Sequence, residues 1–305
     1  MERKISNENF TWHHFDDNGE ETIKKLHKSF EFHHLDMEDV ESGPQQPKAD
    51  FYKDYMFAIF HFPYFAGEEK RIHVTELDVF LGKDYIITIT KGSDSRIHEI
   101  FDRVSSDKEY KKDTMGQDAA FFLYRVIDEL TENCWPVVRS MSNQINDIEE
   151  EIYSEEMRKE TVRQIALIRR NLIRLKRIIV PQLFVITTLV QADKAYLKNS
   201  LTVYFDDVRD TLNRIKAITE GHFEVMDTLH NVNESLISQR TNEVIKVLTV
   251  ISVSLLPMTL LTGVYGMNIQ GLPFVDHANS VWLIFGVILL IISSILIYFR
   301  RRDWL

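Results

Sequence analysis

The C-terminal part of the chain alternates between polar and apolar stretches. No Asp, Glu, Lys or Arg occurs from Val247 to Tyr265, and none occurs from Val281 to Phe299. Each run has about 19 residues, and at about 1.5 Å per helical residue it covers nearly all of a hydrocarbon core of about 30 Å. Two such runs are rare in soluble proteins, so the pattern predicts two transmembrane helices rather than two buried core helices.

Basic residues flank these two runs on one side of the membrane only. Arg240 and Lys246 precede the first run and Arg300 to Arg302 follow the second, whereas the linker from Gly266 to Ser280 contains no Lys or Arg. Positive charge is enriched in cytoplasmic flanks. We therefore expect a multi-pass protein of the cytoplasmic (inner) membrane with both termini in the cytoplasm. The polar first thirty residues predict no cleavable signal peptide.

The remainder of the chain predicts an α+β membrane protein with a mixed α/β N-terminal part followed by long helices. Alternating and aromatic-rich segments predict strands at Phe51–Tyr64, Ile72–Leu81 and Tyr85–Thr90. Pro181, inside a helical pattern from about Glu160 to Gln191, predicts a kink or a break. The expected organisation is a cytoplasmic α/β domain at 1–115, a cytoplasmic helical region at 116–200, a stalk helix continuing into the first transmembrane helix at 201–265, an external loop at 266–280, a second transmembrane helix at 281–299 and a basic cytoplasmic tail at 300–305.

One side of the expected stalk helix carries a seam of mostly small polar residues. Its members recur at intervals of four and three: Asn231, Ser235, Ser238, Asn242, Ile245, Thr249, Ser252, Leu256 and Thr259. Single hydroxyls in membrane helices often join two helices. Polar side chains at bilayer depth also face water-filled cavities, and the length of the seam favours a pore. A lone helix cannot enclose a pore, so this interpretation requires a symmetric oligomer, in which rings of Ile245 and Leu256 gate by dewetting.

Composition narrows the choice of partners. The formal net charge is −10, and the acidic excess lies before residue 241. This charge argues against nucleic acid and is compatible with cations, although acidic surfaces also serve solubility. The single cysteine, Cys134, excludes an internal disulfide and suits a cytosolic domain. The sequence contains no nucleophile elbow, phosphate loop or HExxH motif, so we do not expect an enzyme.

Two histidine pairs, His13-His14 and His33-His34, have the chemistry of metal ligands. Neither pair has a cysteine nearby, and neither provides two histidines four residues apart on a helix. We therefore expect structural or surface roles for these histidines.

Several motifs in the C-terminal third occur together. Tyr265-Gly266-Met267-Asn268 ends the first apolar run, and Thr241-Asn242-Glu243-Val244 precedes it; Pro257 and Thr259 lie within it, and the chain ends in Trp304-Leu305. With these features the chain resembles the CorA-type magnesium transporter family. The resemblance is close over residues 200–305 and loose upstream. It implies a funnel-shaped homopentamer in the lipid bilayer that takes up Mg2+, with Co2+ and Ni2+ as further candidate ions and no organic cofactor.

The resemblance also implies roles for individual residues. Gly266, Met267 and Asn268 are the expected selectivity filter, in which Asn268 oxygens accept hydrogen bonds from the waters that Mg2+ releases reluctantly. The expected pore lining is Asn242, Ile245, Thr249, Ser252, Leu256 and Thr259. Cytoplasmic Mg2+ bound between subunits at Asp207 and Asp210 is expected to regulate closure.

The sequence departs from the family pattern at two places, the outer loop and the cytoplasmic end of the seam. Leu272-Pro273-Phe274 stands where the family often has methionine, proline and glutamate, and Asn231 stands where some members have an acid. A Zn2+ transporter of the same architecture therefore stays open as an alternative, as does a membrane-anchored interaction or sensing module that conducts no ions.

Overall fold

The computed structural model describes residues 2–66, 71–91, 96–154, 159–197, 201–267, 280–302 and 304. The chain divides into two compact units, Met1–Leu229 and His230–Leu305.

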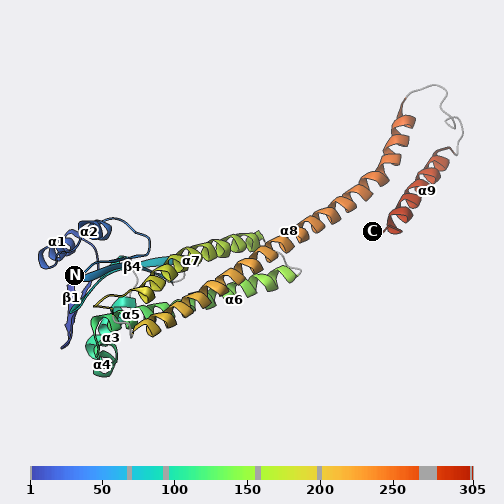
Figure 1. Ribbon diagram of the computed structural model, residues 1–305. Coiled ribbons are helices and arrows are strands. Elements are labelled where there is room, and N and C mark those ends of the chain that lie inside the picture. The colour runs from blue at the N-terminus through green and yellow to red at the C-terminus, as the bar shows by residue number, and fades with distance from the viewer. Residues whose placement is uncertain are drawn as a thin grey trace. The chain divides into compact units, whose positions relative to one another are not determined.

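A six-stranded sheet organises the first unit (Figure 1). Its strands are β1 (Glu2–Ser6), β2 (Thr11–Phe15), β3 (Lys48–Phe51), β4 (Tyr55–Phe65), β5 (Ile72–Gly82) and β6 (Tyr85–Lys91). They are arranged in the order β1-β2-β6-β5-β4-β3. The β2–β6 pair is parallel and the other four pairs are antiparallel.

The strands expected at 72–81 and 85–90 are present as β5 and β6, but the strand expected at 51–64 is divided. The chain turns between β3 and β4, where the Tyr52 N–H donates a hydrogen bond to the Tyr55 carbonyl at 2.9 Å. The expected strand is therefore present mainly as β4, which begins at Tyr55, and Phe51 is the last residue of the preceding antiparallel strand β3.

Helices cover both faces of the sheet, so central strands such as β4 are apolar on both sides. On one face, α1 (Glu20–Ser29) and α2 (His34–Glu41) place Leu26 and Val40 against Phe57 and Phe80. On the other face lie α3 (Arg96–Ser106), α5 (Ala119–Glu132), α6 (Trp135–Tyr153) and α7 (Lys159–Gln191), and α4 (Lys108–Met115) connects α3 to α5. Trp12 of β2 is fully buried there, with Phe101 and Phe122 each at 4.8 Å between ring centroids.

Helix α7 continues through Pro181, so the expected break does not occur. Two buried amide side chains fix this helix to the sheet. Gln182 Oε1 accepts a hydrogen bond from the His61 N–H at 2.9 Å, and Asn171 Oδ1 accepts one from the Ile72 N–H at 3.3 Å. These bonds satisfy backbone donors of β4 and β5 and hold α7 on either side of the proline.

Replacing Gln182 tests this anchoring. Gln182→Met keeps the side-chain length but leaves the His61 N–H without its acceptor, which costs about 1–3 kcal/mol of stability. We expect a lower melting temperature in thermal unfolding of the purified protein. Gln191→Met, the same change at the exposed end of α7, is the matched control and should leave the melting temperature unchanged. Equal melting temperatures for the two variants would contradict the anchoring role.

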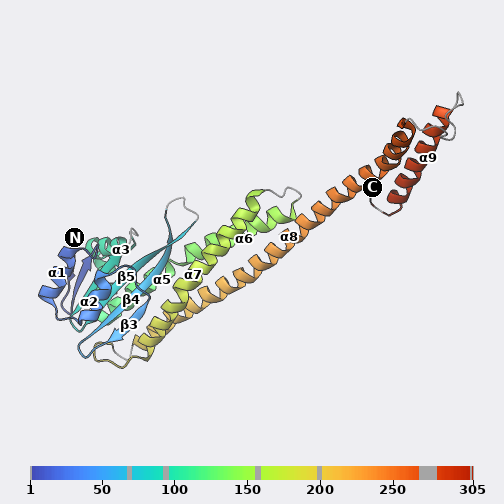
Figure 2. The same ribbon diagram turned by 90° about the horizontal axis from the view of Figure 1, so that it is seen from above.

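The first part of α8 (Thr202–Gly266) packs on α5, α6 and α7 within the first unit, as both views show (Figures 1 and 2). Its buried residues recur at helical intervals: Phe205, Val208, Leu212 and Ile215. Ion pairs join its exposed side to α7, with Arg169 to Asp227 at 3.2 Å and Lys176 to Glu220 at 3.3 Å. As expected, the helix starts close to residue 201 and runs through Pro257.

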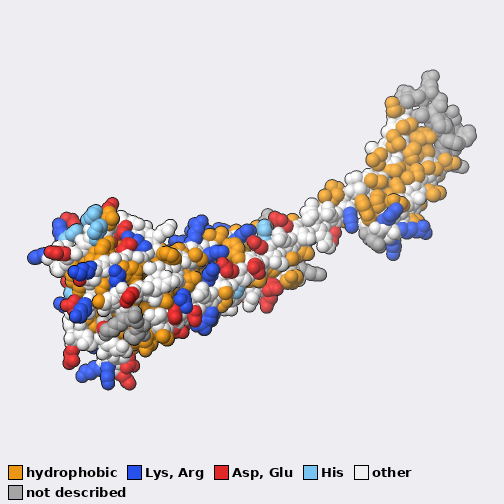
Figure 3. Space-filling view, in the orientation of Figure 1, with side chains coloured by type: hydrophobic (Ala, Val, Ile, Leu, Met, Phe, Trp, Pro, Cys, Tyr) orange, Lys and Arg blue, Asp and Glu red, His pale blue; other side chains and the backbone are white. Residues whose placement is uncertain are grey.

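The second unit contains the end of α8 and the helix α9 (Ser280–Arg300). Both helices are long and apolar enough to cross a membrane, and only 6% of each apolar window is buried. A core helix of a soluble protein would be mostly covered, whereas hydrophobic side chains lie open over these two helices (Figure 3). Within this unit the apolar runs therefore expose the surface that a bilayer would solvate.

Candidate ion pathway and cation-binding site

The polar seam of α8 lies on the side of the helix that α9 leaves uncovered. The side facing α9 is marked by the buried Val250 and by three half-buried residues, Ser254, Pro257 and Leu261. At about 100° per residue, the centre of the seam from Asn242 to Thr259 lies roughly 140° around the helix from this side. Ile245 and Leu256 are 53% and 63% exposed. Asn242, Ser252 and Thr259 are also exposed, and Thr249 is half-buried.

Hydroxyl groups in the seam present oxygen acceptors. Thr249 Oγ1 donates to the Ile245 carbonyl at 2.7 Å, and Thr259 Oγ1 donates to the Leu255 carbonyl at 3.0 Å. Each hydroxyl hydrogen is engaged within the helix, so the oxygen lone pairs remain to accept hydrogen bonds. Such oxygens bind the hydrogens of water, and they suit a cation that keeps its hydration shell.

The expected selectivity filter is described only in part. Gly266 is the last residue of α8, and the Met267 N–H donates to the Val264 carbonyl at 3.3 Å. Asn268 lies outside the described residues. A Cβ at Gly266 would meet no atom within 4 Å, so nothing in the described part of a single chain requires glycine there.

The C-terminal tail lies beside the start of the first apolar run. Trp304 lines a pocket with Ser238, Asn242, Ile245 and Lys246, all within the second unit. The two helices of this unit therefore form a hairpin whose polar ends lie together. This arrangement agrees with the expectation that Lys246 and the three arginines at the end of α9 and just after it, Arg300 to Arg302, lie at the same face of the membrane.

Both expected regulatory acids, Asp207 and Asp210, are exposed on α8 in the first unit. Asp128 of α5, which the sequence analysis did not single out, lies near Asp207. Burial raises the pKa of the Asp128 carboxyl, Arg125 opposes this shift, and the negative charges of Glu132 and Asp207 add to it. Asp128 and Asp207 therefore repel each other when both are ionised, and a cation placed between them would relieve that repulsion.

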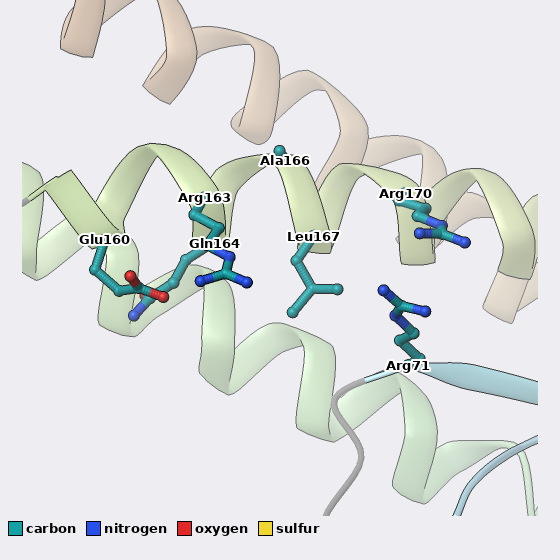
Figure 4. A pocket seen from close by; sticks show the side chains of 7 residues that line it. All are labelled: Arg71, Glu160, Arg163, Gln164, Ala166, Leu167 and Arg170. Carbon is teal, nitrogen blue, oxygen red and sulfur yellow. The ribbon is translucent and has the colours of Figure 1, made fainter.

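A pocket beside α7 has the opposite charge. Its lining residues are Arg71, Glu160, Arg163, Gln164, Ala166, Leu167 and Arg170, and Figure 4 shows the Arg71 and Arg170 side chains pointing toward the same space. Three guanidinium groups against one carboxylate repel cations. The pocket is therefore a poor place for a divalent metal ion, in contrast to the Asp128–Asp207 region.

Comparison with known proteins places the chain in a family. The model of the family "CorA-like Mg2+ transporter protein" matches residues 7–301. The cobalt/magnesium transport protein CorA of Thermotoga maritima is 28% identical over 286 residues, which cover 93% of this chain and 80% of the relative. The structure of the CorA magnesium transporter from Methanocaldococcus jannaschii has the same fold, with a TM-score of 0.83 at 21% identity, covering 99% of this chain and 94% of that one. The chain is therefore a member of the CorA-like Mg2+ transporter family, whose proteins move divalent cations across membranes and are not enzymes.

Proposed function

We propose that the protein is a gated channel for hydrated Mg2+ in the cytoplasmic membrane, with both termini in the cytoplasm. The observation that carries this proposal is the polar seam of α8, which continues into the apolar run of this helix on the side turned away from α9. Hydroxyl and amide groups facing lipid tails would be costly, whereas facing water they are satisfied.

Association of several copies of the chain would create the water-filled space that the seam requires. Several copies with their seams turned inward would enclose a pore, and a closed ring satisfies every copy equally. We propose a funnel-shaped homopentamer, in which α8 lines the pore and α9 faces the lipid. The rings of Ile245 and Leu256 are then the apolar constrictions of the pathway.

The neutral oxygen groups of the proposed pathway favour Mg2+ as the transported ion. Mg2+ holds its waters tightly, and a filter of Gly266, Met267 and Asn268 with a pore of hydroxyl groups contacts those waters without replacing them. Neutral groups also release the ion, as conduction requires. Co2+ is proposed as a secondary ion, because the name of the Thermotoga maritima relative includes cobalt as well as magnesium. Ni2+ is proposed as a further secondary ion from the family resemblance of the sequence. An inside-negative potential favours entry of a divalent ion by about 4.6 kcal/mol per 100 mV.

Cytoplasmic Mg2+ is proposed to close the channel by binding at Asp207 and Asp210. Asp128 adds a third carboxylate in the same chain, and a neighbouring subunit completes the site. Binding at the contact between subunits couples occupancy to closure, because the ion binds the closed arrangement more tightly than the open one.

Flux into reconstituted vesicles tests the proposal. We expect an inside-negative potential to accelerate Mg2+ uptake and Co2+ to inhibit this uptake by competition. Millimolar Mg2+ inside the vesicles should close the channel. Uptake of Zn2+ in preference to Mg2+ would favour the zinc-transporting alternative. A monomer or dimer in detergent, with no flux of any divalent cation, would favour a non-conducting module and overturn the channel.

Cysteine accessibility tests the direction of the seam. Ser252 lies in the seam, and Ser254, two residues further along the helix, lies on the side facing α9. We expect Ser252→Cys to react with a water-soluble, membrane-impermeant thiol reagent and Ser254→Cys to stay unreacted. Cys134 is buried, and Cys134→Ala removes the background. Equal reaction at both positions would contradict the orientation of α8.

A further inference from the structure

Three metal-ligating side chains outside the proposed ion pathway converge in the first unit. His14 lies near the end of β2, Asp16 follows that strand, and His98 lies in the first turn of α3. The ligand atoms of these residues lie within 4.8 Å of one another. Oδ1 of Asp16 is 3.4 Å from His14 Nε2 and 3.0 Å from His98 Nε2.

These distances match the spacing of ligands around a small metal ion. Zinc–nitrogen and zinc–oxygen bonds are about 2.0–2.2 Å long, so two ligands of a tetrahedral ion stand about 3.4 Å apart. Both Nε2 atoms are enclosed, and neither makes a hydrogen bond of good geometry among the described residues. The Nε2 atoms of both imidazoles therefore lie beside one carboxylate oxygen without a hydrogen bond to it among the described residues.

A side-chain contact at the far nitrogen of His14 fixes the orientation of its ring. Its Nδ1 lies 2.9 Å from Thr88 Oγ1, which also accepts a hydrogen bond from Trp12 Nε1 at 2.9 Å. A hydrogen bond at the far nitrogen is the usual way in which proteins orient a metal-binding histidine.

One cation already faces this cluster. Arg3 Nε lies 3.6 Å from Asp16 Oδ1, and its Nη1 lies 3.3 Å from Oδ1 of Asp102. The Arg3 side chain is 34% exposed, so it has room to keep the Asp102 contact while a metal ion takes the Asp16 oxygen. Metal binding at this place therefore competes with the Asp16 contact of Arg3 and leaves its contacts with Asp102 and with the Phe101 ring in place.

We propose that His14, Asp16 and His98 bind one divalent transition-metal ion of the Zn2+, Co2+ or Ni2+ class, with water completing the coordination. Two imidazoles and one carboxylate suit these ions, whereas Mg2+ takes oxygen ligands almost exclusively. The bound ion ties the end of β2 to α3 within the first unit. This inference does not depend on the proposed channel, because all three ligands lie in the first unit and outside the seam.

Cobalt provides a spectroscopic test on the full-length protein in detergent. Excess Mg2+ fills sites made of oxygen ligands, and Co2+ is then titrated while visible absorption is recorded. We expect intense bands of low-coordinate, nitrogen-bound Co2+ that saturate at one ion per chain. In His98→Gln and in Asp16→Asn the apparent affinity should fall at least about tenfold, because each change removes one ligand.

His27→Gln is the matched control, since His27 is an exposed histidine that pairs with Glu41 on α2; it should bind Co2+ as the unmodified protein does. His14→Gln risks misfolding because His14 is fully buried, so the half-exposed His98 carries the test. Zn2+ should raise the melting temperature of the unmodified protein and leave that of His98→Gln unchanged. Absence of the cobalt bands, or bands of full strength in His98→Gln, would overturn the site.

Discussion

Asn268→Ala is expected to abolish selective Mg2+ uptake in reconstituted vesicles, because Asn268, two residues beyond the last residue of α8, is proposed to select the ion. In the proposed pentamer the substitution removes a ring of five amide acceptors for the waters of the hydrated ion. Each hydrogen bond contributes about 0.5–1.5 kcal/mol. The combined loss corresponds to roughly a hundredfold or more in ion affinity at the pore mouth. Uptake is measured with a Mg2+-sensitive dye inside the vesicles.

Two controls separate loss of selection from loss of assembly. Asn268→Ala should retain the oligomeric mass of the unmodified protein in detergent, because the substitution leaves α8 and α9 unchanged. Gln270→Ala, a similar truncation two residues further along the same loop, should retain Mg2+ uptake. Undiminished uptake in Asn268→Ala would reject the proposed filter while leaving the direction of the seam untouched.

Long and strongly periodic segments of this fold could be predicted from the sequence. The two charge-free runs are each about 19 residues long, and the helical pattern from residue 201 meets no proline before Pro257. The two candidate membrane helices could therefore be predicted from the composition of these segments alone. β1 and β2 were not predicted, since Glu2–Ser6 is largely polar and β2 is held by parallel pairing with β6, more than seventy residues away. A kink or a break was predicted at Pro181, and the break was wrong. The buried amides that fix α7 to the sheet on either side of the proline depend on tertiary contacts.

Candidate site residues that repeat along one helix could also be predicted from the sequence, whereas those that meet only in the fold could not. The seam belongs to the first group, and its residues from Asn242 to Thr259 are exposed or half-buried in the structure. Asp128 was missed because its partner Asp207 is a neighbour in space and not in sequence. His14 was assigned a structural or surface role because His98 of α3, which lies beside it in the folded unit together with Asp16, is far from it in sequence.

Asp207→Asn is expected to weaken closure of the channel by internal Mg2+. The proposed regulatory ion draws its binding energy from relief of repulsion between carboxylates, and Asp128, whose pKa burial and the nearby acids raise, is one of them. Removing the Asp207 charge removes both the repulsion and one ligand. Most of a coupling free energy of about 1–3 kcal/mol between Mg2+ binding and channel closure would then be lost. The internal Mg2+ concentration that closes half of the channels should therefore rise about tenfold.

Asp206→Asn is the control, because Asp206 is adjacent on α8 but pairs with Arg209 at 2.9 Å. Mg2+ efflux from vesicles loaded at graded internal concentrations gives the dose response, and an identical curve for Asp207→Asn would exclude Asp207 from the gate.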